Sequence, residues 1–113
     1  MKRTLNRGSQ FRRVFRTGKA FRGGSFRAVY AKNALGFIRL GFSLSAKSGN
    51  AVSRNLMRRR IRSLARGKRV GADIVILPVG GLEGLKWQAV KRDFDELLRR
   101  MEDRFSEGAD EEK

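Results

Sequence analysis

The side chains of this 113-residue chain that could do chemistry are mostly guanidinium groups. The sequence has no histidine and no cysteine, which removes imidazole bases, thiolate nucleophiles and the usual zinc ligands. Between Ser48 and Gly67, the stretch "SGNAVSRNLMRRRIRSLARG" carries six arginines and no acidic residue. Because planar guanidiniums suit phosphate oxygens, this stretch favours the binding of a polyanion over acid–base or thiol catalysis.

The positive charge is concentrated in the first part of the chain. The formal net charge is +16, and the first acidic residue is Asp73. Twenty lysines and arginines precede it, whereas the residues from 73 onward carry seven basic and eleven acidic groups. Such clustering of one sign opposes folding unless a polyanion lies near. A nucleic acid is the first candidate partner and an anionic membrane surface the second.

The arginine-rich stretch, from about 50 to 66, predicts an amphipathic helix. At 100° per residue, a stripe of arginines about three turns long repeats at every fourth position: Arg54, Arg58, Arg62 and Arg66. Asn55 and Arg59 lie on the same side, and Arg60 falls within the apolar arc. The opposite side is expected to dock on a sheet through Leu56, Met57, Ile61 and Leu64. Because the core needs this side, a membrane-surface helix is disfavoured.

The remaining segments predict a single α+β domain over residues 1–105, in the order α-β-β-β-α-β-α. A first helix capped by Ser9 ends at Gly18. Strands at 25–32 and 37–46 suggest an antiparallel pair, with a short extra strand near 19–21. The apolar run from Ile74 to Leu77 predicts a buried strand that Pro78 ends. Helical spacing predicts a final helix from 87 to 105, and residues 106–113 form an acidic tail expected to be disordered.

Aromatic side chains suggest a second contact surface. Phe11 and Phe15 on the first helix, with Arg27 and Val29 on the following strand, could form a groove where unpaired bases stack. The alternative is that both phenylalanines belong to the core, and their periodicity alone favours that alternative.

Several ordered motifs resemble one family, the bacterial ribonuclease P protein subunit. The stretch "LGFSLSAKSGNAVSRNLMRRRIR", Leu40 to Arg62, is similar to its signature, and agreement extends to "FRRVFRTGKAF", to "DIVIL" and to the final helix. Leu56 stands where the family usually repeats arginine, and Arg60 where an apolar residue is common. The resemblance implies helices on a four-stranded mixed sheet, with a left-handed crossover in place of the usual right-handed one.

The resemblance also implies a function. The chain would be the non-catalytic subunit of an RNA-based endoribonuclease that removes the 5′ leader of precursor tRNA in the cytoplasm, with one protein per RNA. The RNA would catalyse hydrolysis with Mg²⁺, and the protein alone would hold no cofactor or metal. The residues implied to contact the catalytic RNA are Lys47, Asn50, Arg54, Asn55, Arg58, Arg59, Arg62 and Arg66. Phe11, Phe15, Arg27 and Val29 would line the leader cleft.

Two other functions stay open at this point. A general structured-RNA-binding or ribosomal protein could use the same arginine stripe without any role in cleavage. A protein-only nuclease would need metal ligands, for which the sequence offers Asp73, Asp93, Asp95 and Glu96. Helical spacing instead favours Asp93 and Glu96 as ion-pair partners of neighbouring arginines. The absence of a long apolar run and of a signal-peptide pattern gives the cytoplasm as the expected location.

Overall fold

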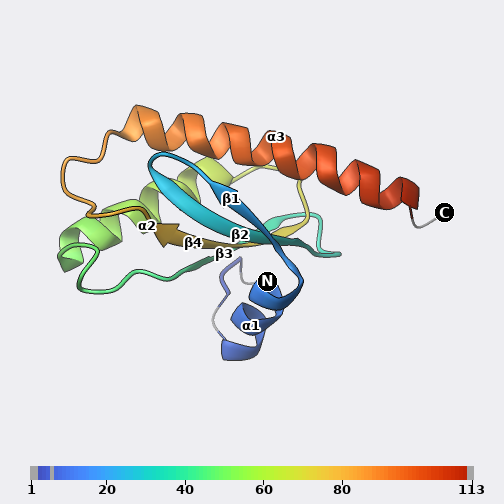
Figure 1. Ribbon diagram of the computed structural model, residues 1–113, viewed down its shortest axis with the longest axis horizontal. Coiled ribbons are helices and arrows are strands. Elements are labelled where there is room, and N and C mark those ends of the chain that lie inside the picture. Colours follow the sequence, from blue (N-terminus) through green and yellow to red (C-terminus); the bar gives the residue numbers. More distant parts are fainter. Residues whose placement is uncertain (1–2, 6, 112–113) are drawn as a thin grey trace.

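The computed structural model describes residues 3–5 and 7–111, and the side chains within this range up to residue 106. Seven elements follow one another in the predicted order α-β-β-β-α-β-α. They are α1 (Gly8–Thr17), β1 (Lys19–Arg22), β2 (Phe26–Lys32), β3 (Ile38–Phe42), α2 (Ala51–Ala65), β4 (Ala72–Pro78) and α3 (Trp87–Glu111). The helices pack on a four-stranded mixed sheet, as expected (Figure 1).

The sheet order corrects one prediction. β2 and β3 do not form an antiparallel pair, because β4 lies between them in the order β1-β2-β4-β3. β4 is antiparallel to β2 and parallel to β3, with Val75 opposite both Val29 and Gly41. Five consecutive residues of β4 are buried, so the apolar run of this strand is explained by its central place. β3, α2 and β4 therefore form a parallel crossover, whose left-handed sense stays a prediction.

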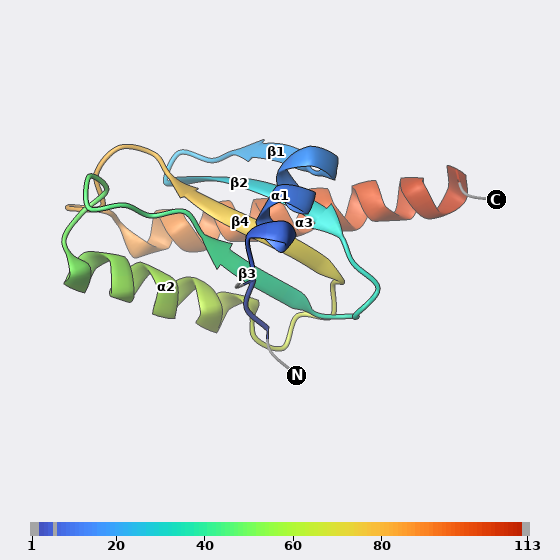
Figure 2. The same ribbon diagram turned by 90° about the horizontal axis from the view of Figure 1, so that it is seen from below.

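The two faces of the sheet carry different layers. α2 and α3 cover one face with the main core, in which Phe26, Ile74 and Phe94 are fully buried. α1 covers the other face with a smaller cluster around Val14 and Val75. Figure 2 shows α1 in front of the sheet and α3 behind it. The sheet thus separates the arginine-rich helix from the helix that carries Phe11 and Phe15.

The ends of α1 depart in part from expectation. Arg7, not Ser9, takes the N-cap position, and its backbone N–H donates to Oε1 of Gln10 at 3.2 Å. The helix ends before Gly18, as predicted. A Cβ at Gly18 would lie 2.4 Å from the carbonyl oxygen of Val14 and 2.7 Å from that of Tyr30. Glycine is therefore required where the chain turns from α1 into the sheet.

α2 docks through a narrower apolar face than predicted. Met57 and Ile61 are fully buried, Ala65 is buried beside them, and Leu64 is half-buried against the same core. Leu56 is not part of that core, and it lines a shallow groove with Leu82 and Trp87 instead. The prediction that Leu56 docks on the sheet is therefore wrong.

The C-terminal helix runs further than the sequence pattern indicates. Its core-facing residues end near Phe105, as expected, but α3 continues to Glu111. The boundary of the folded domain at residue 105 and the disorder of 106–113 stay predictions. Within the part of the chain that the structure describes, no helix combines the length and apolar character needed to cross a membrane.

Candidate nucleic-acid interface

The arginine stripe lies along α2, on a helix held rigidly by its buried face. Asn50 begins the helix, since its Oδ1 accepts a hydrogen bond from the backbone N–H of Ser53 at 2.8 Å. Gly67 follows the helix end with a φ of 80°, a conformation that suits glycine. The stripe from Arg54 to Arg66 spans about 18 Å at 1.5 Å per residue. Local sequence thus sets both ends of a straight row of cations.

The predicted contact residues differ in exposure. Lys47, Asn50, Asn55, Arg59, Arg62 and Arg66 are exposed, whereas Arg54 and Arg58 are half-buried. Among the described residues, none of these cations forms an ion pair. Arg58 donates to Oδ1 of Asn55 at 3.0 Å, and the Nε of Arg54 is buried without a hydrogen-bond partner. The stripe therefore has free donor capacity, and no acid among the described side chains neutralises it.

Arg3, which is not among the predicted contact residues, joins this surface from the amino-terminal segment. The backbone N–H of Leu40 donates a hydrogen bond to the carbonyl oxygen of Arg3 at 3.0 Å, and the carbonyl oxygen of Leu40 accepts one from the N–H of Leu5 at 2.8 Å. The amino-terminal segment therefore runs along the outer edge of β3. Arg3 thereby reaches a small pocket of about 170 Å³ that Arg62 and Arg66 also line. Three guanidiniums therefore surround one concavity beside the end of α2.

Aromatic rings hold two of these guanidiniums. The Cζ of Arg3 lies 4.6 Å from the ring centroid of Phe37, and that of Arg62 lies 5.5 Å from the ring centroid of Phe42. Such contacts restrain an exposed arginine without neutralising its charge. No sequence pattern could have placed Arg3 here, because its position depends on a single bridge between Thr4 and Leu40.

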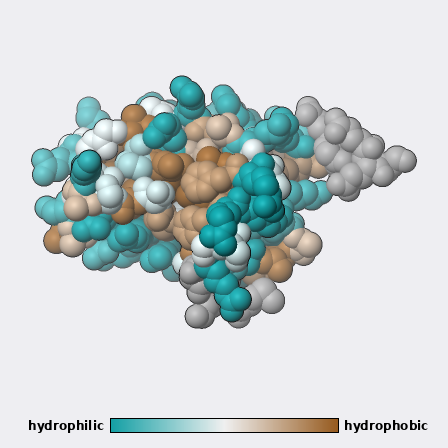
Figure 3. Space-filling model, turned by 60° about the horizontal axis from the view of Figure 1, so that its bottom comes forward, coloured by the Kyte–Doolittle hydropathy of each residue, from teal (hydrophilic) through white to brown (hydrophobic). Residues whose placement is uncertain are grey.

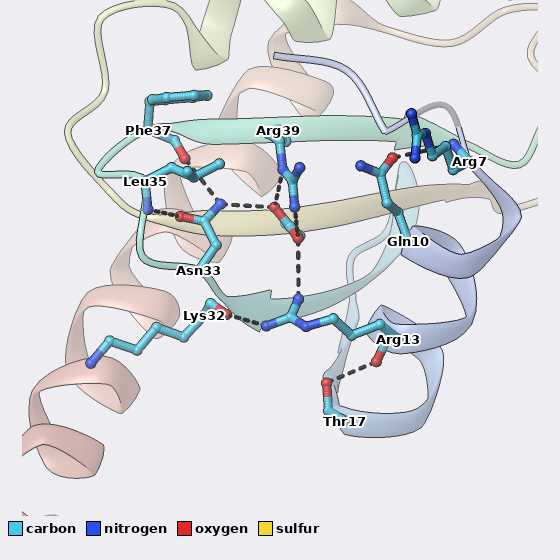
Figure 4. A network of polar contacts seen from close by, with 10 residues as sticks. Arg7, Gln10, Arg13, Thr17, Lys32, Asn33, Leu35, Phe37 and Arg39 are labelled. Atoms are coloured by element: carbon cyan, nitrogen blue, oxygen red, sulfur yellow. Dashed lines mark hydrogen bonds and ion pairs between the residues drawn. The ribbon is translucent and has the colours of Figure 1, made fainter. Parts of the chain in front are cut away.

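Asp73, the first acid of the chain, neutralises a different pair of arginines. These are Arg13 and Arg39, whose guanidiniums point toward one another in Figure 4. The buried carboxylate of Asp73 accepts two hydrogen bonds from Arg39, at 2.8 and 2.7 Å, and one from Arg13 on α1 at 3.1 Å. Asn33 donates to the same group at 2.8 Å. Arg13 also donates to the carbonyl of Lys32 at 2.9 Å. The network ties α1 to β2, β3 and β4.

Burial alone would raise the pKa of Asp73, because a charged carboxylate is poorly solvated inside the protein. Hydrogen bonds from Arg39 and Asn33, with the charges of Arg39 and Arg13, outweigh this effect and hold its pKa below the ordinary value. The hydrogen bond to Asp73 in turn raises the pKa of Arg39. Asp73 is therefore a structural anion, and its part in a metal site is not supported.

The predicted cleft residues share the α1 face of the sheet, but the two phenylalanines differ. Phe11 is half-buried, and a Cβ at Gly41 would lie 2.7 Å from its Cζ. Phe15 is 49% exposed. Phe11 thus belongs partly to the smaller core, as the alternative held, whereas Phe15 does not.

The same face carries Val29, half-buried beside α1, and Arg27, which is exposed. Arg27 pairs across the sheet with Leu77, itself half-buried. Figure 3 shows apolar side chains gathered over the sheet next to the hydrophilic atoms of α1. The result is an exposed apolar surface bordered by cations, here called the α1–β2 surface and defined by Phe11, Phe15, Arg27, Val29 and Leu77.

Two of the other acids offered as metal ligands, Asp93 and Glu96, have structural partners, whereas Asp95 is exposed. Asp93 accepts hydrogen bonds from the backbone and hydroxyl of Ser25, which ties α3 to the β1–β2 turn. Its predicted pairing with a neighbouring arginine is therefore wrong. Glu96 forms an ion pair with Arg99, and its Oε1 lies 3.5 Å from Nε of Arg100, as predicted. Among the residues described, no three His, Cys, Asp or Glu side chains gather into a metal-binding group.

Fold and surface together define a small basic α+β protein with a row of arginines on a docked helix, and no described acid pairs with these arginines. Comparison with known proteins agrees with this class. The family model described as Ribonuclease P matches residues 1–102, and the chain belongs to this family. The family inferred from the sequence motifs is thereby confirmed.

Individual relatives support the same assignment. The ribonuclease P protein component of Natranaerobius thermophilus is 32% identical, over 86% of this chain and 88% of the relative. The ribonuclease P protein component of Streptococcus pneumoniae is 31% identical, over 96% of this chain and 91% of the relative. The solved RNase P protein of Thermotoga maritima, in complex with 1-(4-fluorophenyl)-2-thiourea, is 30% identical with a TM-score of 0.74. That match covers 85% of this chain and 97% of the other.

Proposed function

We propose that this chain is the protein subunit of ribonuclease P and takes part in tRNA processing. The observation that carries the proposal is the row of arginines on α2, which has no acidic partner within the described part of a chain of this family. In this proposal the protein belongs to an RNA-based endoribonuclease of the cytoplasm and contributes binding. Phosphodiester hydrolysis is assigned to the RNA subunit with its Mg²⁺, and one protein binds each RNA.

The α2 surface is proposed to bind the catalytic RNA. Arg54, Arg58, Arg62 and Arg66 present guanidiniums at regular intervals, and Lys47, Asn50, Asn55 and Arg59 extend the surface. A phosphate backbone would neutralise charges that repel one another in the free protein. Rotation of Arg54 toward a phosphate would also give its buried Nε an acceptor, which it lacks at present. Arg3 adds a further cation at the far end of the stripe.

The α1–β2 surface is proposed to bind the single-stranded 5′ leader of precursor tRNA. Phe15 offers an exposed ring for base stacking, and Arg27 offers a cation for the leader backbone. Phe11 and Val29 are half-buried and shape the apolar floor. Because the sheet lies between this surface and α2, the protein could hold the catalytic RNA and the leader at the same time.

A binding comparison tests the assignment of the catalytic RNA. Labelled ribonuclease P RNA and an unrelated structured RNA of equal length are titrated with the protein at the same salt concentration. The proposal expects tighter binding to ribonuclease P RNA, by at least about tenfold, since a specific site exceeds general phosphate attraction. Equal affinity for both RNAs would favour a general RNA-binding protein, for which no observation speaks at present.

A further inference from the structure

A groove of about 700 Å³ lies between α2 and the start of α3. Its volume falls in the range of about 300 to 1,000 Å³ that is typical of small-ligand sites. The side chains that matter for its chemistry are Arg60, Ser63, Lys86, Trp87, Gln88 and Lys91. Three cations thus line the groove, and none of its lining residues is acidic.

Arg60 explains why this groove differs from an ordinary solvated hollow. Its Cζ lies 4.8 Å from the ring centroid of Trp87, whose ring also packs against the main core. Arg60 is an exposed residue, and it forms no ion pair among the described residues. The indole therefore restrains Arg60 at the surface and leaves its charge free for a ligand.

The groove is separate from the arginine stripe. Arg60 lies about 160° around the helix from both Arg58 and Arg62, since each residue advances 100°. An RNA segment that lies along the stripe and contacts Arg58 and Arg62 therefore does not also contact Arg60. This places the unusual arginine outside the proposed surface for catalytic RNA.

The lining groups match one chemical class of ligand. Unpaired bases stack on guanidinium planes and on aromatic rings, and Arg60 with Trp87 supplies both in one place. Lys86 and Lys91 can neutralise a phosphate at the rim. Ser63 and Gln88 offer donors and acceptors to the edge of a base. We propose that this groove binds one unpaired nucleotide of a single-stranded RNA segment, independently of the stripe.

Trp87 is the only tryptophan of the chain, so intrinsic fluorescence reports on this groove directly. The protein is titrated at low salt with a hexamer of adenylate RNA, with adenosine monophosphate and with inorganic phosphate. The RNA should quench the fluorescence saturably, adenosine monophosphate should do so more weakly, and inorganic phosphate should not. Absence of saturable quenching by the RNA, or equal quenching by inorganic phosphate, would overturn the proposal.

Variants assign the signal to the groove. Arg60→Met keeps the side-chain stem over the indole and removes the charge, and it should weaken RNA binding by about 5- to 100-fold, as expected for one lost stacked base. Arg92→Met removes the same charge from an exposed α3 residue outside the groove and should change affinity less than threefold. Circular dichroism checks that both variants fold. An unchanged affinity in Arg60→Met, or an equal loss in Arg92→Met, would overturn the assignment.

The double variant Arg58→Ala, Arg62→Ala separates this inference from the proposed function. It alters the stripe and leaves the groove lining intact, so saturable quenching by the adenylate hexamer should persist. If that quenching disappears while Arg60→Met retains it, the RNA binds at the stripe and the groove proposal is wrong. Either result leaves the separate test on ribonuclease P RNA unaffected.

Discussion

Replacement of Arg58 and Arg62 by alanine removes the middle of the stripe and leaves both of its ends in place. Neither side chain has an acidic partner among the described residues, so each can contact a phosphate without breaking an internal ion pair. Each phosphate contact contributes about 0.7 to 0.9 to the slope of log affinity against log salt. The double variant should therefore lower this slope by about 1.4 to 1.8.

The effect on measured affinity follows from that slope. Over a fourfold rise in salt, from about 50 to 200 mM, the affinity gap between the wild type and the variant should narrow by about 7- to 12-fold. The free protein should lose little stability. Removal of three like-charge pairs, spaced four residues apart, relieves about 0.6 to 1.5 kcal/mol. Loss of the contact between Arg62 and Phe42 costs about 0.5 to 1 kcal/mol.

Fluorescence anisotropy of labelled ribonuclease P RNA, measured over a salt series, gives the slope. The control is the double variant Arg92→Ala, Arg104→Ala, which removes two exposed charges from α3. It should keep the wild-type slope, because these residues lie outside α2. A wild-type slope in the Arg58 and Arg62 variant would refute the assignment. An equal loss in both double variants would show that net charge, and not the α2 surface, governs binding.

Three further predictions concern the other face of the sheet. Asp73→Asn should lower the melting temperature at pH 7 by at least about 10 °C, because it leaves the half-buried guanidinium of Arg39 without its buried anionic partner. Folding lowers the pKa of Asp73, so the stabilisation that its ion pairs provide is complete above about pH 3.8. This stabilisation is lost as the pH falls through the lowered pKa. The gap in melting temperature should therefore narrow as the pH falls further below about 3.8, and a gap that does not narrow at any acid pH would contradict this. Gly41→Ala should cost about 1 to 3 kcal/mol in urea unfolding, because its Cβ would clash with Phe11; an unchanged midpoint would argue against the packing. Phe15→Ser should change stability by less than about 1 kcal/mol and weaken binding of leader-bearing precursor tRNA more than of mature tRNA, so an equal loss for both RNAs would speak against leader contact.

The elements of the fold could be predicted from the sequence, but the pairing of the strands could not. Local periodicity is enough to show the strand around Tyr30, the buried run from Ile74 to Leu77 and the helix that begins near Trp87. Neighbouring strands in sequence favour a hairpin, so β2 and β3 were expected to pair. The insertion of β4 between them depends on long-range packing, which no local pattern contains.

The site shows the same division between local and long-range information. The stripe on α2 could be predicted because its spacing lies within one helix. Arg3 could not be selected, since a bridge to β3 brings it to Arg62 and Arg66. Arg13 and Arg39 carry the same charge as the arginines of the stripe, but the fold pairs both of them with Asp73. Charge counting therefore indicates the class of partner, whereas only the fold separates free arginines from neutralised ones.

The central claim is that this protein assists ribonuclease P RNA in processing precursor tRNA. The most direct measurement adds the protein to that RNA and a leader-bearing precursor tRNA at low Mg²⁺, and follows release of the 5′ leader. The proposal predicts faster cleavage at the mature 5′ end when the protein is present, and less stimulation by the Arg58 and Arg62 double variant. Cleavage that is no faster with the protein, or cleavage by the protein with no RNA subunit present, would contradict it.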